Sequence, residues 1–210
     1  KRQIWGFDLA NEPDDSGVQP PCLDWQALAL RTAQAIRKID PERTIIVEPA
    51  GMGNPAAFER FRLLPLDGVV YSIHWYAPGT YTHQGVFTQG PSIRYPGTIE
   101  GEVWNKDRLR KGLAPALDFA RRYRVHMYVG EFGAVRWAPG NEQYLGDLVS
   151  LFEEWGWDWS FHAFREWHGW SIEHGSDRRD EAPKGTASAR AQAILRAFSL
   201  NRSRREASAP

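Results

Sequence analysis

Short apolar runs alternate along the chain with longer segments whose apolar residues recur every three or four positions. The apolar runs predict strands over residues 3–9, 44–47, 69–73, 125–129 and 157–164. The segments between and after them predict helices over residues 25–39, 55–64, 105–123, 141–155 and 186–198. Strand and helix therefore alternate five times. This order is typical of an α/β fold with a parallel sheet and helical crossovers.

Local signals set several of the expected boundaries. Asp24 is a suitable N-cap for the first helix, and Asp40-Pro41 ends it. Asn105 has the same capping role at the third helix, and Gly156 is a suitable residue to follow the fourth. Residues 77–104 carry many Gly, Pro and Thr residues, and they predict a long loop. Loops of this length within a compact domain are usually functional.

The composition excludes several classes of protein. Of the 210 residues, 42% are hydrophobic and 25% charged, the proportions of a folded domain; only the polar, basic residues 201–210 predict a disordered tail. No apolar run approaches the ~18 residues of a membrane span. The 26 basic and 26 acidic residues balance, so we expect no nucleic-acid partner. Ten Trp, seven Tyr and ten Phe indicate an aromatic core or a surface that binds a flat ligand.

Polar residues gather where the predicted strands end. They are Asn11-Glu12, Glu48, His74 to Tyr76, Glu131 and Glu166-Trp167. Each alone has an ordinary explanation, such as a turn residue, a solvated carboxylate or a packed core histidine. Because the carboxyl ends of parallel strands meet at one rim, however, the sequence predicts that they lie together. Two carboxylates in a cleft lined by aromatic rings are the equipment for glycoside hydrolysis.

Other chemistries find little support. His162, His168 and His174 recur every six residues, which matches no common zinc spacing, so we expect no metal site and no cofactor. Gly51-Met52-Gly53 is too short for a phosphate-binding loop and lacks its Lys, and the nucleophile elbow of esterases is missing from the sequence. Glu48 and Glu166 stay open between a structural role and hydrogen bonding to sugar hydroxyls.

Three motifs and a Trp-rich final strand together resemble glycoside hydrolase family 5, the cellulase-type family of clan A. The motifs are Phe7-Asp8-Leu9-Ala10-Asn11-Glu12-Pro13, His74-Trp75-Tyr76 and Val129-Gly130-Glu131-Phe132-Gly133. The resemblance covers nearly all of residues 3–200. It implies a (β/α)8 TIM barrel, of which residues 1–200 would supply the last five βα units as a partial, open barrel. The first three strands have no counterpart here, so the resemblance makes the missing N-terminal part of the same barrel a partner of this chain.

The resemblance also implies roles for individual residues. Glu12 would be the general acid/base, supported by His74, and Asn11 would bind the sugar 2-hydroxyl at the cleavage site. Glu131 would be the nucleophile, held by Tyr76. After the last strand, Trp167 would be the sugar platform, with Trp170 as an open alternative.

The leading hypothesis is thus a retaining glycoside hydrolase that cleaves β-glycosidic bonds in a polysaccharide or glycoconjugate by double displacement. The alternative is a non-catalytic carbohydrate-binding protein, or an inactive fragment that lacks the first three barrel strands. The substrate stays open among β-glucan, mannan, xyloglucan and glycolipid. The family resemblance implies secretion, and we expect a carbohydrate substrate and no membrane span.

Overall fold

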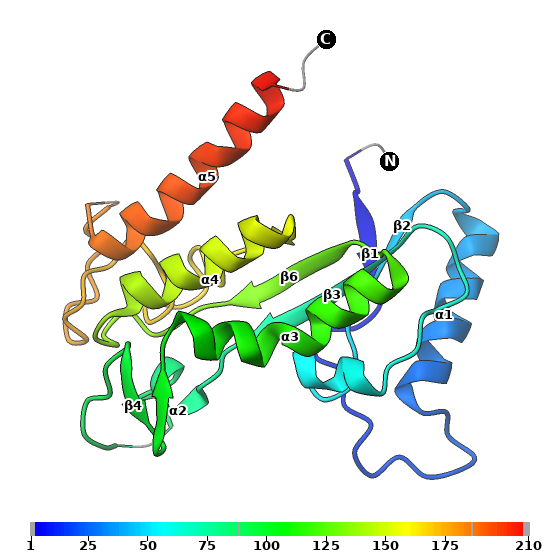
Figure 1. Ribbon diagram of the computed structural model, residues 1–210, viewed down its shortest axis with the longest axis horizontal. Helices are drawn as coiled ribbons and strands as arrows, with labels where there is room; N and C mark the ends of the chain where they lie inside the picture. Colours follow the sequence, from blue (N-terminus) through cyan, green and yellow to red (C-terminus); the bar gives the residue numbers. More distant parts are fainter. Residues whose placement is uncertain (1–2, 88, 186, 208–210) are drawn as a thin grey trace. The chain divides into compact units, whose positions relative to one another are not determined.

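A five-stranded sheet runs through the computed structural model, which describes residues 3–87, 89–185 and 187–207 (Figure 1). Its strands, in the order in which they pair, are β1 (Gly6–Asp8), β2 (Thr44–Val47), β3 (Val69–Trp75), β6 (Met127–Phe132) and β7 (Asp158–Trp159). The pairs β1–β2, β2–β3 and β6–β7 are parallel, with Phe7 opposite Ile45 and Ile46 opposite Val70. Within the described residues the order ends at β1 and β7, so the sheet is open. The predicted parallel α/β order is confirmed.

Helices and one hairpin lie between and after these strands. They are α1 (Trp25–Ile39), the 3-10 helix η1 (Pro55–Glu59), α2 (Gly79–Thr82), the antiparallel pair β4 (Gly97–Ile99) and β5 (Glu102–Trp104), α3 (Lys106–Tyr123), α4 (Asn141–Trp155) and α5 (Ala189–Ala207). The Asp24 side chain accepts a hydrogen bond from the Ala27 N–H (2.8 Å), which caps α1 where the sequence predicts. In the described part of the chain, no helix has the length and apolarity needed to cross a bilayer.

Three predicted elements differ in the structure. The helix expected over 55–64 is only the short η1, which ends at Glu59. The expected loop 77–104 contains α2 and the β4–β5 hairpin, whose turn residues Glu100 and Gly101 both have positive φ. A turn with two positive φ angles suits a two-residue hairpin, but Glu-Gly is not its usual sequence signal. The last strand, expected over 157–164, is reduced to β7.

The C-terminal helix is longer than the sequence suggests. α5 begins at Ala189 and continues to Ala207, whereas the apolar pattern predicts a helix over 186–198. Arginine, which occurs three times in residues 199–207, is a good helix former. The disordered tail expected over 201–210 stays a prediction, and residues 208–210 lie outside the described residues.

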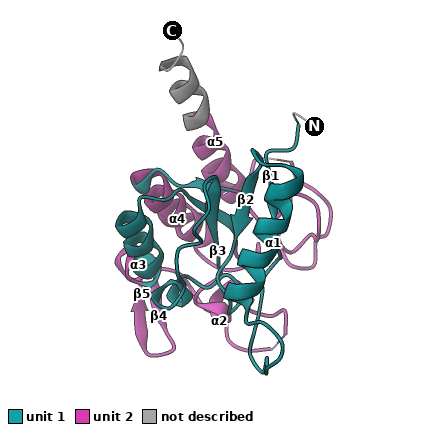
Figure 2. Ribbon diagram, turned by 90° about the vertical axis from the view of Figure 1, so that its right-hand side faces the viewer, with its two compact units in different colours: residues 1–75, 112–131, 155–159 teal, residues 76–111, 132–154, 160–210 magenta. Residues whose placement is uncertain are grey.

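The chain divides into two compact units (Figure 2). The first unit comprises residues 3–75, 112–131 and 155–159. It contains β1, β2, β3, β6 as far as Glu131, and β7, together with α1, η1 and the later part of α3. Its core contains a group of rings from Phe58, Phe61, Tyr71 and Phe119, whose centroids lie 4.5–6.4 Å apart. This packing fixes the start of β3 against η1 and α3. The sheet is thereby a firm base for residues at its carboxyl ends.

The second unit comprises the described residues of 76–111, 132–154 and 160–207. Its buried aromatic group is formed by Tyr81, Tyr95 and Tyr144, with centroids 5.3–6.0 Å apart. The buried guanidinium of Arg190 donates to the carbonyls of Ala134 (2.8 Å) and Trp170 (2.6 Å), and burial lowers its pKa to about 9. These bonds fix the long irregular segment that carries Trp170.

Candidate active site

Four titratable residues lie at the carboxyl ends of neighbouring strands in the first unit. Glu12 follows β1 after three residues, and Glu48 follows β2 directly. His74 is the next-to-last residue of β3, and Glu131 is the next-to-last residue of β6. The sequence places Glu131 just after its strand, whereas the strand in fact includes it. Because the strands run in one direction, all four residues meet at one rim of the sheet.

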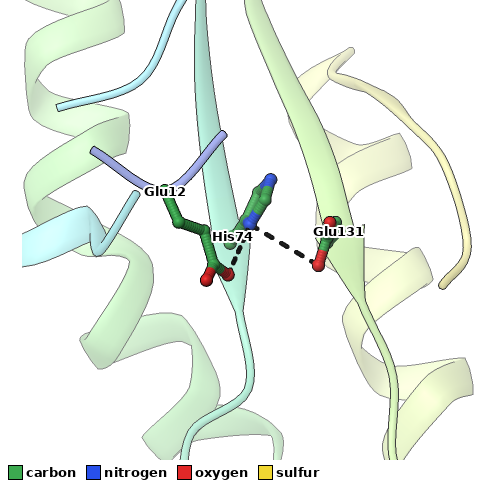
Figure 3. Close-up of side chains that lie close together, drawn as sticks. All are labelled: Glu12, His74 and Glu131. Carbon is green, nitrogen blue, oxygen red and sulfur yellow. Dashed lines mark hydrogen bonds and ion pairs between the residues drawn. The ribbon is translucent and has the colours of Figure 1, made fainter. Parts of the chain in front are cut away.

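The imidazole of His74 lies between the carboxylates of Glu12 and Glu131 (Figure 3). Its Nδ1 is 2.8 Å from Oε1 of Glu12 and 3.6 Å from Oε2 of Glu131. On the other side of the ring, Nε2 is 3.2 Å from Oε1 of Glu48. The side chains of Glu12 and Glu131 are 33% and 24% exposed, but that of Glu48 is only 1% exposed. Glu12 and Glu131 can therefore meet a substrate, whereas Glu48 cannot.

The backbone at Glu12 has an unusual conformation. Its φ of 46° is in the left-handed region, which costs a non-glycine residue on the order of 1–3 kcal/mol. The backbone N–H of Glu12 donates to Oε2 of Glu48 (3.2 Å), and the carbonyl of Pro13 accepts from the N–H of Met52 (3.1 Å). These bonds hold the turn in place and direct the Glu12 side chain toward His74.

Glycines allow the close packing around this group. A Cβ at Gly130 would lie 3.0 Å from Nε2 of His74 and 3.0 Å from Oγ of Ser72. At Gly53, which has a φ of +67°, a Cβ would lie 2.6 Å from Oε2 of Glu48. Any side chain at either position would displace the imidazole or the buried carboxylate. Close packing of His74 and Ser72 against β6 thus explains why glycine precedes Glu131 in this strand.

Charge at the site favours a protonated imidazole. Burial alone would lower the pKa of His74, but the carboxylates of Glu48 and Glu12, with the charge of Glu131, outweigh burial and raise it to about 9. The ring then donates from Nδ1, and it balances part of the negative charge of its neighbours.

This charge predicts a loss of stability at alkaline pH. A pKa raised from 6.5 to about 9 stabilises the folded state fully below pH 6.5, and this contribution disappears as the pH rises through 9. Its size is on the order of 3 kcal/mol. Urea unfolding of the whole gene product at pH 6.5 and pH 10 measures it. His74→Gln should flatten the pH dependence, whereas His126→Gln, which removes an exposed histidine paired with Asp158 (2.7 Å), should leave it. If the free energy of unfolding changed equally with pH in both variants, a raised pKa of His74 would not be its cause.

Glu12, His74 and Glu131 offer three donor atoms within 4.8 Å of one another, a spacing that by distance alone suits a metal ion. In the structure the three residues form an ion-paired group, in which the imidazole of His74 lies close to both carboxylates. The expectation of no metal site stays a prediction.

Asn11 and Tyr76 occupy different units. Asn11 is exposed beside Glu12 in the first unit. Tyr76 belongs to the second unit, where its ring centroid lies 5.2 Å from that of His83, 5.7 Å from Trp170 and 6.2 Å from His162.

Trp167 and Trp170 also lie in the second unit, with ring centroids 6.1 Å apart, and both are half-buried. Trp167 also contacts Trp137 edge-on at 5.7 Å. The choice between Trp167 and Trp170 as sugar platform stays open. Glu166 is exposed and lies 2.7 Å from Nε2 of His162, and the choice between a structural role and hydrogen bonding to sugar stays open.

The sequence alone does not reveal how Glu48 takes part. Its position directly after a strand is the same signal that identifies Glu12 and Glu131. That signal does not tell a buried carboxylate from an exposed one. The structure does, because the Glu48 carboxylate is enclosed and its backbone carbonyl accepts a hydrogen bond from Nε1 of Trp25 (2.7 Å).

Several curated proteins are similar to this chain in sequence. Endoglucanase C of Acetivibrio thermocellus is 29% identical over 181 residues, which cover 73% of this chain and 52% of that protein. Cellodextrinase A of Ruminococcus flavefaciens is 30% identical over 186 residues, covering 87% of this chain and 50% of that protein. The chain thus spans about half the length of the curated relatives it matches.

Solved structures agree with the fold. One crystal structure of a glycoside hydrolase aligns with a TM-score of 0.72 at 29% identity and covers 91% of this chain and 59% of that one. Cel5A of Thermotoga maritima, in complex with cellobiose, aligns with a TM-score of 0.72 at 23% identity, over 90% of this chain and 58% of that one. The predicted α/β fold, a partial and open barrel, is confirmed.

The family model for cellulases matches residues 1–174, which include the rim residues Glu12, Glu48, His74 and Glu131 as well as Trp167 and Trp170. That match covers most of the chain and agrees with the motifs from which the family was expected. The chain belongs to the cellulases of glycosyl hydrolase family 5.

Proposed function

We propose that this chain carries the two catalytic carboxylates of a retaining β-glycoside hydrolase, with Glu12 as general acid/base and Glu131 as nucleophile. The observation that carries the proposal is the approach of both carboxylates to Nδ1 of His74, with one oxygen of each within 4.8 Å of the other. Retaining enzymes place their carboxyl groups about 5–5.5 Å apart, whereas inverting enzymes need roughly 6.5–9.5 Å to admit a water.

The reaction has two steps. In the first, an oxygen of Glu131 attacks the anomeric carbon while Glu12 gives its proton to the leaving glycosidic oxygen, so the C–O bond to the aglycone breaks and a glycosyl ester forms. In the second, Glu12 removes a proton from water, whose oxygen attacks the anomeric carbon and releases Glu131. The imidazolium of His74, 2.8 Å from Glu12, stabilises the carboxylate that Glu12 becomes after the first step.

Further residues receive roles in this proposal from their place in the family motifs. Asn11, exposed beside Glu12, would hydrogen-bond the sugar 2-hydroxyl, and Tyr76 would hold Glu131. Trp167 or Trp170 would stack on the apolar face of a sugar ring. For the substrate we propose a β-glucan, since the relatives described above are an endoglucanase and a cellodextrinase.

The stereochemical course of hydrolysis tests the proposal. The whole gene product is incubated with β-glucan, mannan, xyloglucan and a β-linked glycolipid, and the first product anomer is followed by proton NMR. We expect cleavage of β-glucan with the β-anomer appearing first. An α-anomer as first product would contradict the assignment of Glu131 as nucleophile. Binding to these glycans without cleavage would favour the alternative of a carbohydrate-binding protein.

A further inference from the structure

Glu48 touches the acid/base from a side that substrate cannot reach. Its carboxylate has one oxygen on the backbone N–H of Glu12 (3.2 Å) and the other 3.2 Å from Nε2 of His74. The buried Glu48 carboxylate thus contacts the two groups that set the position of the Glu12 side chain: the Glu12 backbone and the imidazole of His74.

The backbone contact has a definite consequence. Glu12 has a left-handed φ of 46°, so its conformation persists only where surrounding bonds compensate the strain. The bond from its N–H to Glu48 joins residues 36 positions apart in the sequence. Without this bond, relaxation of Glu12 to an ordinary φ would lower the free energy of the chain. That change would turn the Glu12 carboxylate away from His74.

The imidazole contact acts through charge. His74 is 5% exposed, and its two nitrogens face carboxylates on opposite sides: Glu12 and Glu131 at Nδ1, Glu48 at Nε2. Asp8, the exposed last residue of β1, senses the same charges: partial desolvation and the charge of Glu48 raise its pKa to about 6, whereas the charge of His74 acts to lower it. Of the three carboxylates around the ring, only Glu48 is closed off from substrate.

We propose that Glu48 is a positioning residue of the acid/base: from the buried side of His74 it keeps the imidazolium directed at Glu12 and Glu131, and it holds the Glu12 backbone in its left-handed turn. This inference rests on the proposed function, in which Glu12 transfers the protons. Glu48 itself touches neither substrate nor reacting atom.

Charge and shape can be separated with two variants. Glu48→Gln keeps the size and an oxygen that can accept from the Glu12 N–H, but it removes the charge. We expect kcat to fall roughly 10–100-fold with little change in KM, the loss typical when a residue that orients a functional side chain is removed. We also expect the alkaline limb of the pH profile of kcat to move to lower pH. Glu48→Asp keeps the charge but shortens the reach. It should lower kcat while its alkaline limb stays nearer that of the parent.

The exposed Glu59 of η1 supplies the matched control. Glu59→Gln removes one carboxylate from the same unit without touching the rim, so it should leave kcat and the pH profile unchanged. Thermal unfolding of all three variants shows that each is folded at the assay temperature. If Glu48→Gln does not fold, the comparison of Glu48→Asp with the parent decides the question.

A readout without substrate separates this inference from the proposed function. The histidine rings of the whole gene product are labelled with ¹⁵N, the signal of His74 is assigned by its loss in His74→Gln, and its titration is followed by NMR. We expect the His74 midpoint to fall by roughly one pH unit or more in Glu48→Gln, because a carboxylate beside the ring is lost, and to stay unchanged in Glu59→Gln. If the parent hydrolyses no glycan but this shift appears, the proposed function fails and the Glu48–His74 contact stands. An active parent whose Glu48→Gln variant keeps its kcat, pH profile and His74 midpoint overturns the inference.

Discussion

Replacing Glu131 by Gln should reduce the turnover of every glycoside substrate by roughly 10⁵-fold or more, which is the size of loss expected when a covalent nucleophile is removed. The amide has nearly the shape of the carboxylate, so the fold should survive. The amide lacks the negatively charged oxygen that attacks the anomeric carbon. A substrate with a better leaving group still needs that nucleophile. The loss should therefore be as complete on activated aryl glycosides as on β-glucan.

The measurement compares steady-state rates of parent and Glu131→Gln on both kinds of substrate, with Glu59→Gln as the control from the same unit. Calorimetric titration with an oligosaccharide should show that Glu131→Gln still binds. Residual activity above about 1% of the parent on either substrate would exclude Glu131 as the sole nucleophile.

Much of the fold follows from local sequence signals. α1 begins as predicted because the side chain of Asp24 accepts a hydrogen bond from the N–H of Ala27, and it ends at Ile39, directly before Asp40-Pro41. The order of the parallel strands follows from the alternation of apolar runs with helical segments. The β4–β5 hairpin is missed, since its Glu100-Gly101 turn has positive φ at a residue that seldom adopts it. Local rules fail there because pairing across the hairpin decides the conformation.

The site shows the same division between local and distant causes. Glu12, His74 and Glu131 can be selected from the sequence because each stands where a strand ends, and parallel strands end at one rim. The part of Glu48 cannot, because it depends on enclosure by distant segments and on a bond to the Glu12 backbone. The left-handed turn at Glu12 is likewise invisible in the sequence, where a glutamate gives no hint of positive φ.

Glu12→Gln should behave differently from Glu131→Gln, and the difference depends on the leaving group. β-Glucan needs a proton on its departing oxygen, so its hydrolysis should fall on the order of 10²–10⁴-fold, the usual contribution of a general acid/base. An activated aryl glycoside leaves without that proton, so Glu131 should still attack it and form the glycosyl ester. Release of the ester then becomes slow, because no base activates the water.

The expected signature in Glu12→Gln is a rapid burst of aryl product equal to the enzyme concentration, followed by slow turnover. Azide should accelerate the slow phase and yield a β-glycosyl azide, since an anion attacks the anomeric carbon without giving up a proton. Glu131→Gln cannot form the ester, so it should show neither burst nor rescue. The two carboxylates lie on either side of one imidazole nitrogen, at 2.8 and 3.6 Å, and their surroundings alone do not rank them as acid and nucleophile. The burst does, because it arises only where the nucleophile is intact and the base is missing. If azide gave the β-glycosyl azide with Glu131→Gln and not with Glu12→Gln, the two roles would have to be exchanged.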